Sequence, residues 1–399
     1  MSRSEVLVPG SMSLDGLLTT AHPIGNDSIE TILHPYWQQF DIENTIPDSW
    51  HYAVAAWMTF FGILGVSGNL LVVWTFLKTK SLRTAPNMLL VNLAIGDMAF
   101  SAINGFPLLT ISSINKRWVW GKLWCELYAF VGGIFGLMSI NTLAWIAIDR
   151  FYVITNPLGA AQTMTKKRAF IILTIIWANA SLWALAPFFG WGAYIPEGFQ
   201  TSCTYDYLTQ DMNNYTYVLG MYLFGFIFPV AIIFFCYLGI VRAIFAHHAE
   251  MMATAKRMGA NTGKADADKK SEIQIAKVAA MTIGTFMLSW TPYAVVGVFG
   301  MIKPHSEMFI HPLLAEIPVM MAKASAAYNP IIYALSHPKF RAEIDKHFPW
   351  LLCCCKPKPK AQLPSSTTKG SIASKTEADT SVSQVTEVEM AEPAANPSA

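Results

Sequence analysis

Seven long apolar segments, separated by short polar stretches, limit what this sequence can fold into more than any other feature. Each is long enough to supply the ~20 apolar residues that a helix needs to cross the hydrocarbon core of a membrane. Inside a bilayer the backbone polar groups have to be satisfied within the segment, which favours helices. The predicted fold is therefore an all-α membrane protein, a seven-transmembrane helix bundle. The segments cover residues 52–77, 86–113, 124–154, 168–191, 215–246, 274–302 and 308–335.

Composition excludes several other classes of protein. Hydrophobic residues make up 53% of the 399-residue chain and charged residues only 14%, which is too apolar for an ordinary soluble protein of this length. The formal net charge of +2 gives no reason to expect nucleic-acid binding. A transporter or channel is disfavoured because the sequence shows no internal repeat and no line of charged pore residues. We expect no metal site and no enzymatic activity.

Basic side chains predict the orientation of the bundle. Lys and Arg are frequent in the connections after the first, third and fifth segments and in the tail, whereas residues 192–214 carry neither. The positive-inside rule then places the N-terminus outside the cell and the C-terminus in the cytoplasm, with Lys116 and Arg117 as a minor exception. Residues 1–51 lack a basic head followed by an apolar core, so no cleaved signal peptide is expected.

The regions that flank the bundle (52–335) have their own patterns. Residues 1–51 form the predicted extracellular tail, in which Asn26 is a candidate glycosylation site. In residues 336–350 apolar side chains recur every fourth position, which predicts an amphipathic helix on the membrane surface. Residues 351–399 are predicted to be a disordered cytoplasmic tail. It begins with candidate palmitoylation sites that would contact membrane lipids, namely Cys353, Cys354 and Cys355.

A set of short motifs occurs in order, one or two to a segment. They are Gly68-Asn69, Asn92 to Asp97, Asp149-Arg150-Phe151, Trp177, Pro229 with Tyr237, Ser289 to Tyr293, and Asn329-Pro330-Ile331-Ile332-Tyr333. Together they resemble the rhodopsin-like family of G-protein-coupled receptors over about residues 50–350. Phe151 departs from the pattern, where tyrosine is usual. Because phenylalanine keeps the ring and loses only the hydroxyl, we expect coupling to survive.

Lys323 is the residue that most strongly suggests a function. A lysine in the middle of a membrane is costly and is a functional candidate by default. It lies well inside its predicted segment (308–335), far from either end, so its side chain would not easily reach the surface; a structural lysine paired with a carboxylate remains an alternative. Its position six residues before Asn329 resembles that of the retinal-attaching lysine of opsins.

That resemblance implies a cofactor and partners. The cofactor would be 11-cis-retinal, held as a protonated Schiff base and isomerised to all-trans by light. The residues His337-Pro338-Lys339-Phe340-Arg341 and the stretch from Gly190 to Gly198 resemble the Gq-coupled rhabdomeric and melanopsin-type opsins. They imply a heterotrimeric Gq-type G protein, a receptor kinase and arrestin as partners, and a location in the plasma membrane of a photoreceptor cell. The many serines and threonines of the tail would be the phosphorylation sites, although an unmodified tail explains them equally well.

A protonated Schiff base needs a nearby anion. Many vertebrate pigments carry a glutamate three residues after the cysteine that starts the third helix; here that residue is Tyr128, a neutral phenol. Glu197, six residues before Cys203, matches the family's other counterion position, and the alternative is a loop carboxylate that faces water. The resemblance also implies a disulfide between Cys125 and Cys203, as opposed to two free thiols. A counterion that stays paired after isomerisation would make the pigment bistable.

Other residues match the family's chromophore pocket and its activation switch. Trp290 and Tyr293 flank Pro292 in the sixth segment and would lie in the pocket, with Pro292 as a hinge. Arg150 would pair with Asp149 and Glu272 in the dark, unless Glu272 is only a solvated surface charge. Activation would break these pairs and open a cleft for the G protein. The remaining switch residues would be Tyr237, Asn329, Pro330 and Tyr333. Asp97 and Asn69, with Asn329 and Tyr333, would form a polar network around water or sodium, or else a purely structural one.

Two further functions remain open at this stage. A retinal photoisomerase would share Lys323 but would supply 11-cis-retinal instead of signalling, and the intact Asp149-Arg150-Phe151 and Asn329-Pro330 motifs argue against it. In a receptor for a diffusible ligand Lys323 would be accidental.

Overall fold

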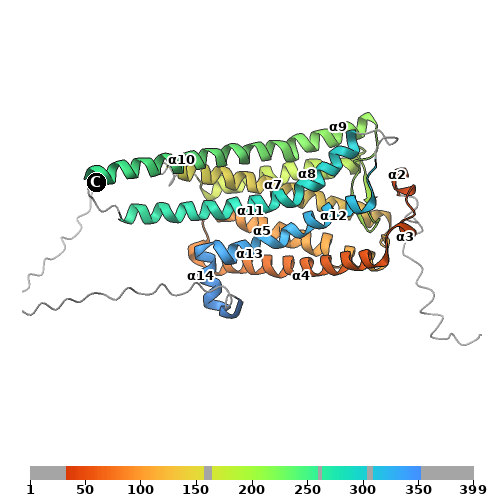
Figure 1. Cartoon of the computed structure of the whole chain (residues 1–399), viewed down its shortest axis with the longest axis horizontal. Coiled ribbons are helices and arrows are strands. Elements are labelled where there is room, and N and C mark those ends of the chain that lie inside the picture. Colours follow the sequence, from red (N-terminus) through yellow and green to blue (C-terminus); the bar gives the residue numbers. More distant parts are fainter. Residues whose placement is uncertain (1–32, 157–163, 259–262, 303–308, 352–399) are drawn as a thin grey trace, which may run out of the picture. The chain divides into compact units, whose positions relative to one another are not determined.

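A computed structural model describes residues 33–156, 164–258, 263–302 and 309–351 of the chain. Long helices run alongside one another in this part of the chain (Figure 1). Among the described residues, six helical stretches are long and apolar enough to cross a membrane. They are α4 (Asp48–Lys78); α5 (Asn87–Phe100) with the π-helical turn η3 (Ser101–Gly105) and α6 (Leu108–Ile114); α7 (Gly121–Thr155); α8 (Lys166–Leu185) with η5 (Ala186–Phe189); α9 (Met212–Gly220), η6 (Met221–Ile227) and α10 (Phe228–Met258); and α11 (Gly263–Ile302).

The seventh crossing is not the continuous helix that the sequence predicts. It consists of α12 (Pro312–Ala324), the 3₁₀ turn η7 (Ser325–Ala327) and α13 (Tyr328–Ser336). Pro330 explains the break, because it has no N–H and its ring crowds the carbonyl four residues earlier. That carbonyl, of Ala326, instead accepts a hydrogen bond of 2.8 Å from Asn69 Nδ2 on α4. The break therefore directly follows Lys323.

The bundle is apolar on its outside as well as in its core. α7 lies at the centre and packs against α5, α8, α10 and α11. Many large apolar side chains point outward, among them Phe170, Phe235 and Leu288, which are 67%, 66% and 73% exposed. Exposed apolar surface on this scale is unfavourable in water and marks a surface that is covered by another apolar medium. The prediction of a membrane helix bundle is confirmed.

Two antiparallel strands close one end of the bundle, which we call the sheet end. They are β1 (Tyr194–Glu197) and β2 (Ser202–Tyr205), with Glu197 paired to Ser202. A disulfide between Cys125 and Cys203 joins β2 to α7, with the two Cα atoms 5.4 Å apart, as predicted. The short helices α2 (Pro35–Gln38) and α3 (Ile42–Thr45) belong to the same end. The strands therefore sit as a plug that is fixed to the central helix.

The opposite end, which we call the Arg150 end, carries α14 (Pro338–His347), the amphipathic helix that the sequence predicts. Its apolar side chains Phe340 and Ile344 are buried and pack in a cluster with Val72 and Phe76 of α4. His337 begins the helix, because its Nδ1 accepts the backbone N–H of Phe340 at 3.2 Å. This cap fixes the turn between α13 and α14.

Some predicted sites lie outside the described residues. They are Asn26, Cys353, Cys354, Cys355, the serines and threonines of the tail, and the side chain of Glu272.

The buried cap residue leads to a pH-dependent prediction. Burial, together with the charges of Lys339 and Arg150, lowers the pKa of His337 from 6.5 to about 4. In the unfolded chain the His337 imidazole binds a proton below about pH 6.5, whereas in the folded chain it binds one only below about pH 4. The free energy of unfolding therefore falls as the pH drops through this window. The loss from this one group is at most about 3 kcal/mol.

The measurement is the melting temperature of the detergent-solubilised protein between pH 7 and 4, for wild type and His337→Asn. Asparagine also caps helices well but does not titrate, so the variant should lose less stability on acidification. Identical pH profiles for the two proteins would contradict the role given to His337.

Candidate functional site

A cavity lies between α7, α11, α12 and the plug. Lys323, Glu197 and Tyr293 line it, together with Tyr194 and the small residues Gly132 and Gly133. The space is about 80 Å³ in volume. It brings together residues that are more than a hundred positions apart in the sequence, and it is where the two strands meet the helices.

Lys323 enters the cavity from the last turn of α12. Its Nζ atom is buried and makes no hydrogen bond of good geometry to the described part of the chain, but it interacts electrostatically with the Tyr128 hydroxyl and with Glu197 and Glu316. The nearest aromatic group is Tyr128, whose ring centroid lies 5.0 Å from Nζ. A buried amine without a hydrogen-bond partner costs free energy, which makes it a candidate for chemistry instead of structure.

Glu197 is the carboxylate that the plug presents to this lysine. Its Oε2 accepts a hydrogen bond of 3.3 Å from the Tyr293 hydroxyl, and its Oε1 accepts one of 3.5 Å from Ser202. Burial raises the pKa of Glu197 to about 7, while the positive charge of Lys323 opposes the rise and a negative charge on Glu316 would add to it. Glu197 is 1% exposed, so it does not face water, which removes the alternative of a solvated loop carboxylate.

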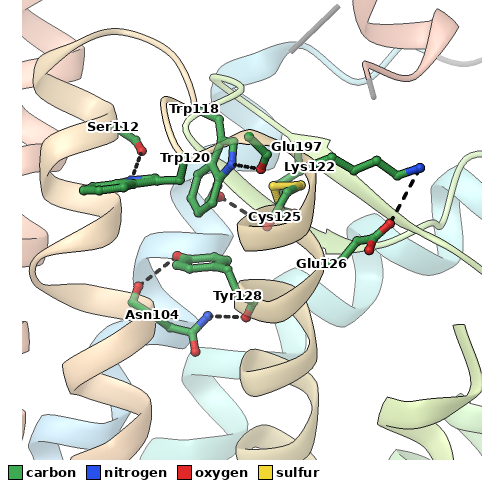
Figure 2. The surroundings of a disulfide bond; sticks show 12 residues. Asn104, Ser112, Trp118, Trp120, Lys122, Cys125, Glu126, Tyr128 and Glu197 are labelled. Carbon is green, nitrogen blue, oxygen red and sulfur yellow. Dashed lines mark hydrogen bonds and ion pairs between the residues drawn. A yellow bond between two sulfur atoms is a disulfide. The ribbon is translucent and has the colours of Figure 1, made fainter. Parts of the chain in front are cut away.

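Tyr128 supplies a neutral phenol beside Lys323, and its hydroxyl is bonded to the backbone of the bundle. It donates a hydrogen bond of 2.9 Å to the backbone carbonyl of Asn104, while Asn104 Nδ2 donates one of 2.9 Å to the backbone carbonyl of Tyr128 (Figure 2). Glu126, two residues earlier, points away from this pair toward Lys122. The ring of Tyr128 thus forms a neutral wall beside Lys323.

Glu316 is a residue near this site that was not predicted from the sequence. It is 1% exposed, and its Oε2 accepts a hydrogen bond of 3.3 Å from the backbone N–H of Phe199 in the plug. It precedes Lys323 by seven residues, which is about two helical turns and places both on one face of α12. That spacing was a signal in the sequence that could have revealed it.

Trp290 connects the cavity to the broken helix. Its Nε1 donates a hydrogen bond of 2.9 Å to the Ser325 hydroxyl in η7, and its ring lies 6.2 Å from that of Tyr293. An added Cβ at Gly136 of α7 would lie 2.9 Å from the Trp290 ring, so glycine leaves room for it there. A change in the shape of the cavity can therefore be transmitted to α11 and η7 through the Trp290 side chain.

At the Arg150 end, the structure places several of the predicted switch residues around a second cavity of about 330 Å³, lined by Asp149, Arg150 and Tyr333 among others. Arg150 Nε donates to Asp149 Oδ2 at 3.0 Å. Tyr237 donates its hydroxyl to the Ala276 carbonyl of α11 at 3.3 Å.

Between the two ends lies the polar network around Asp97. Asn329 Nδ2 donates to Asp97 Oδ2 at 2.6 Å, and Ser139 donates to Oδ1 at 3.3 Å. Asn69 does not bond to Asp97. Its Nδ2 donates to the carbonyls of Gly65 and Ala326 instead. The network joins the helix break to α5 and α7.

The residues around Lys323 fit a retinal chromophore. The unpaired Nζ provides the attachment atom, the buried carboxylate of Glu197 provides negative charge, and aromatic rings and glycines line the walls.

Such a bundle, with a plugged cavity around a buried lysine, defines a seven-helix membrane receptor. A family model described as 7 transmembrane receptor (rhodopsin family) matches residues 68–333. The Gq-coupled rhodopsin of Mizuhopecten yessoensis is 45% identical over 92% of this chain and 73% of its own length, and the rhodopsin of Enteroctopus dofleini is 48% identical over 81% and 70%. The crystal structure of squid rhodopsin superimposes with a TM-score of 0.77 at 42% identity, covering 86% of this chain and 98% of that one. The chain belongs to the rhodopsin family of seven-transmembrane receptors, and within it to the opsins.

Proposed function

We propose that this protein is a light-sensing receptor that holds retinal covalently on Lys323 and activates a Gq-type G protein. The observation that carries the proposal is the buried Nζ of Lys323, which has no hydrogen bond of good geometry among the described residues and lies in a cavity that also contains Glu197. Retinal, bound there as a protonated Schiff base and isomerised by light from 11-cis to all-trans, would supply the light absorption and the change of shape.

Glu197 would serve as the counterion. An anion close to Lys323 stabilises positive charge on its nitrogen, and the effect is strong where water is excluded. Glu197 belongs to the plug, which the Cys125–Cys203 disulfide ties to α7. It can therefore keep its position while α11 moves. A counterion that stays in place supports a bistable pigment, one that light returns to its dark form.

The signal would pass through Trp290. Its contacts join the cavity to α11 and η7, and Pro292 gives α11 a point at which it can bend. Outward movement of the Arg150 end of α11 would widen the cavity beside Arg150 and disturb its bond to Asp149. A two-state element of this kind can couple ligand shape to G-protein binding.

The proposed orientation puts the sheet end outside the cell and the Arg150 end in the cytoplasm, as the distribution of Lys and Arg indicates. The G protein would then bind at the Arg150 end. In the tail, phosphorylation by a receptor kinase would prepare binding of arrestin, and palmitate on Cys353 to Cys355 would anchor the tail to the plasma membrane of a photoreceptor cell.

The experiment for the attachment is an absorption spectrum of protein purified after incubation with 11-cis-retinal, before and after illumination. Wild type should show a visible band that shifts on illumination without decaying to free retinal, and a second wavelength should reverse the shift. Lys323→Ala should show no such band, because no other amine lies in the cavity lining. Lys122→Ala is the matched control and should behave as wild type. A band in Lys323→Ala would overturn the attachment site.

The counterion has its own test, the alkaline titration of the visible band in Glu197→Gln. Removing the carboxylate takes away the charge that holds the proton, so the band should be lost at a pH about 1–3 units lower than in wild type. Glu126→Gln, which removes a partly exposed carboxylate on the neighbouring helix, should titrate as wild type. An unchanged titration in Glu197→Gln would exclude it as the counterion.

A further inference from the structure

Two carboxylates, not one, are buried beside the proposed attachment lysine. Glu197 and Glu316 are each 1% exposed, and both interact electrostatically with Lys323 and with each other. One comes from the plug and the other from the same helix face as Lys323. The resemblance to opsins accounts for Glu197 and assigns nothing to Glu316.

Glu316 contacts the plug at the turn that directly follows Glu197. Its Oε2 accepts the backbone N–H of Phe199 at 3.3 Å. Gly198 has a φ of +55°, and a Cβ at that position would lie 2.6 Å from the same oxygen. The backbone of the turn thus approaches the carboxyl group as closely as a glycine permits. Glu316 therefore ties the position of Glu197 to α12, and with it to Lys323.

The charges at this site do not balance if both carboxylates are ionised. Lys323 is the one cationic side chain in the lining of the cavity, and the other titratable groups in that lining, apart from Glu197, are phenols: Tyr194, Tyr205, Tyr217 and Tyr293. Two more phenols act on the charged groups from outside the lining, Tyr128 on Lys323 and Tyr207 on Glu197. Two buried anions beside one cation would leave one negative charge without compensation, which is far more costly than a neutral carboxylic acid.

The hydrogen bonds indicate which carboxylate is the neutral one. Both oxygens of Glu197 accept hydrogen bonds from hydroxyl groups, a setting that favours the ionised form. Glu316 accepts one backbone N–H at Oε2, while its Oε1 has no partner among the described residues. Ionising Glu316 would leave a buried, charged oxygen without a donor. This costs more free energy than ionising Glu197, whose two oxygens both have donors.

We propose that Glu316 is a positioning residue of the chromophore site: an uncharged carboxylic acid, with its proton on Oε1, that holds the Gly198–Phe199 turn and leaves Glu197 as the single anion opposite Lys323. The proposal deepens the function given above and rests on it. It assigns no direct contact between Glu316 and retinal.

The experiment compares Glu316→Gln and Glu316→Leu with wild type, using Glu126→Gln as the control. Infrared spectra should show one protonated-carboxyl carbonyl band fewer in Glu316→Gln, while the visible maximum and its alkaline titration stay as in wild type. Glutamine keeps the acceptor for the Phe199 N–H and carries no charge. Leucine removes the acceptor, so retinal release by hydroxylamine in the dark should be about tenfold faster. Glu126→Gln should change none of these.

Two results would overturn the proposal. If the carbonyl band persists in Glu316→Gln and the visible band titrates at a different pH, Glu316 is ionised. If Glu316→Leu releases retinal as slowly as wild type, it does not hold the turn. The infrared spectra and the melting temperature, which should fall in Glu316→Leu alone, can also be measured without retinal. These two measurements decide the role of Glu316 even if wild type forms no visible band and the proposed function is wrong.

Discussion

The cost of burying a lysine inside an apolar bundle is the constraint on which the rest of the site depends. An ammonium group away from water needs an opposing charge or a chemical use. This protein surrounds Lys323 Nζ with the Tyr128 phenol and two carboxylates that interact with it electrostatically, and gives it no hydrogen bond of good geometry within the described residues. Burying the amine in this way costs free energy of folding and brings no structural benefit. It becomes useful when the amine carries a chromophore.

The neighbouring structure holds that arrangement in place from two sides. On one side the disulfide fixes β2 to α7 and the strand pairing fixes Glu197 opposite Ser202. On the other, Pro330 breaks the seventh crossing directly after Lys323, and Asn69 takes up the carbonyl that the proline releases. The break also joins Lys323 to Trp290, through Ser325, and to the Asp97 network, through Asn329. Hydrogen bonds thus link the segment that carries Lys323 to α11 and, through Asp97, to α5 and α7.

Much of this could be predicted from the sequence because membrane segments, their order and their motifs are local patterns. The seven crossings, α14, the disulfide and the burial of Glu197 followed from segment length, periodicity and resemblance. The break at Ser325–Ala327 was missed because a proline can kink or interrupt a helix, and which of these happens depends on a partner such as Asn69. Glu316 was missed for a similar reason. Its spacing from Lys323 was visible, but its contact with Phe199 depends on how the plug folds onto α12.

The central claim is that Lys323 forms the covalent bond to retinal, and the most direct measurement is to trap that bond. Protein loaded with 11-cis-retinal would be reduced with borohydride, digested, and analysed by mass spectrometry. The account predicts a retinyl group on the peptide that contains Lys323 and on no other lysine peptide. A retinyl group on a different lysine, or none on the Lys323 peptide of protein that shows the visible band, would contradict it.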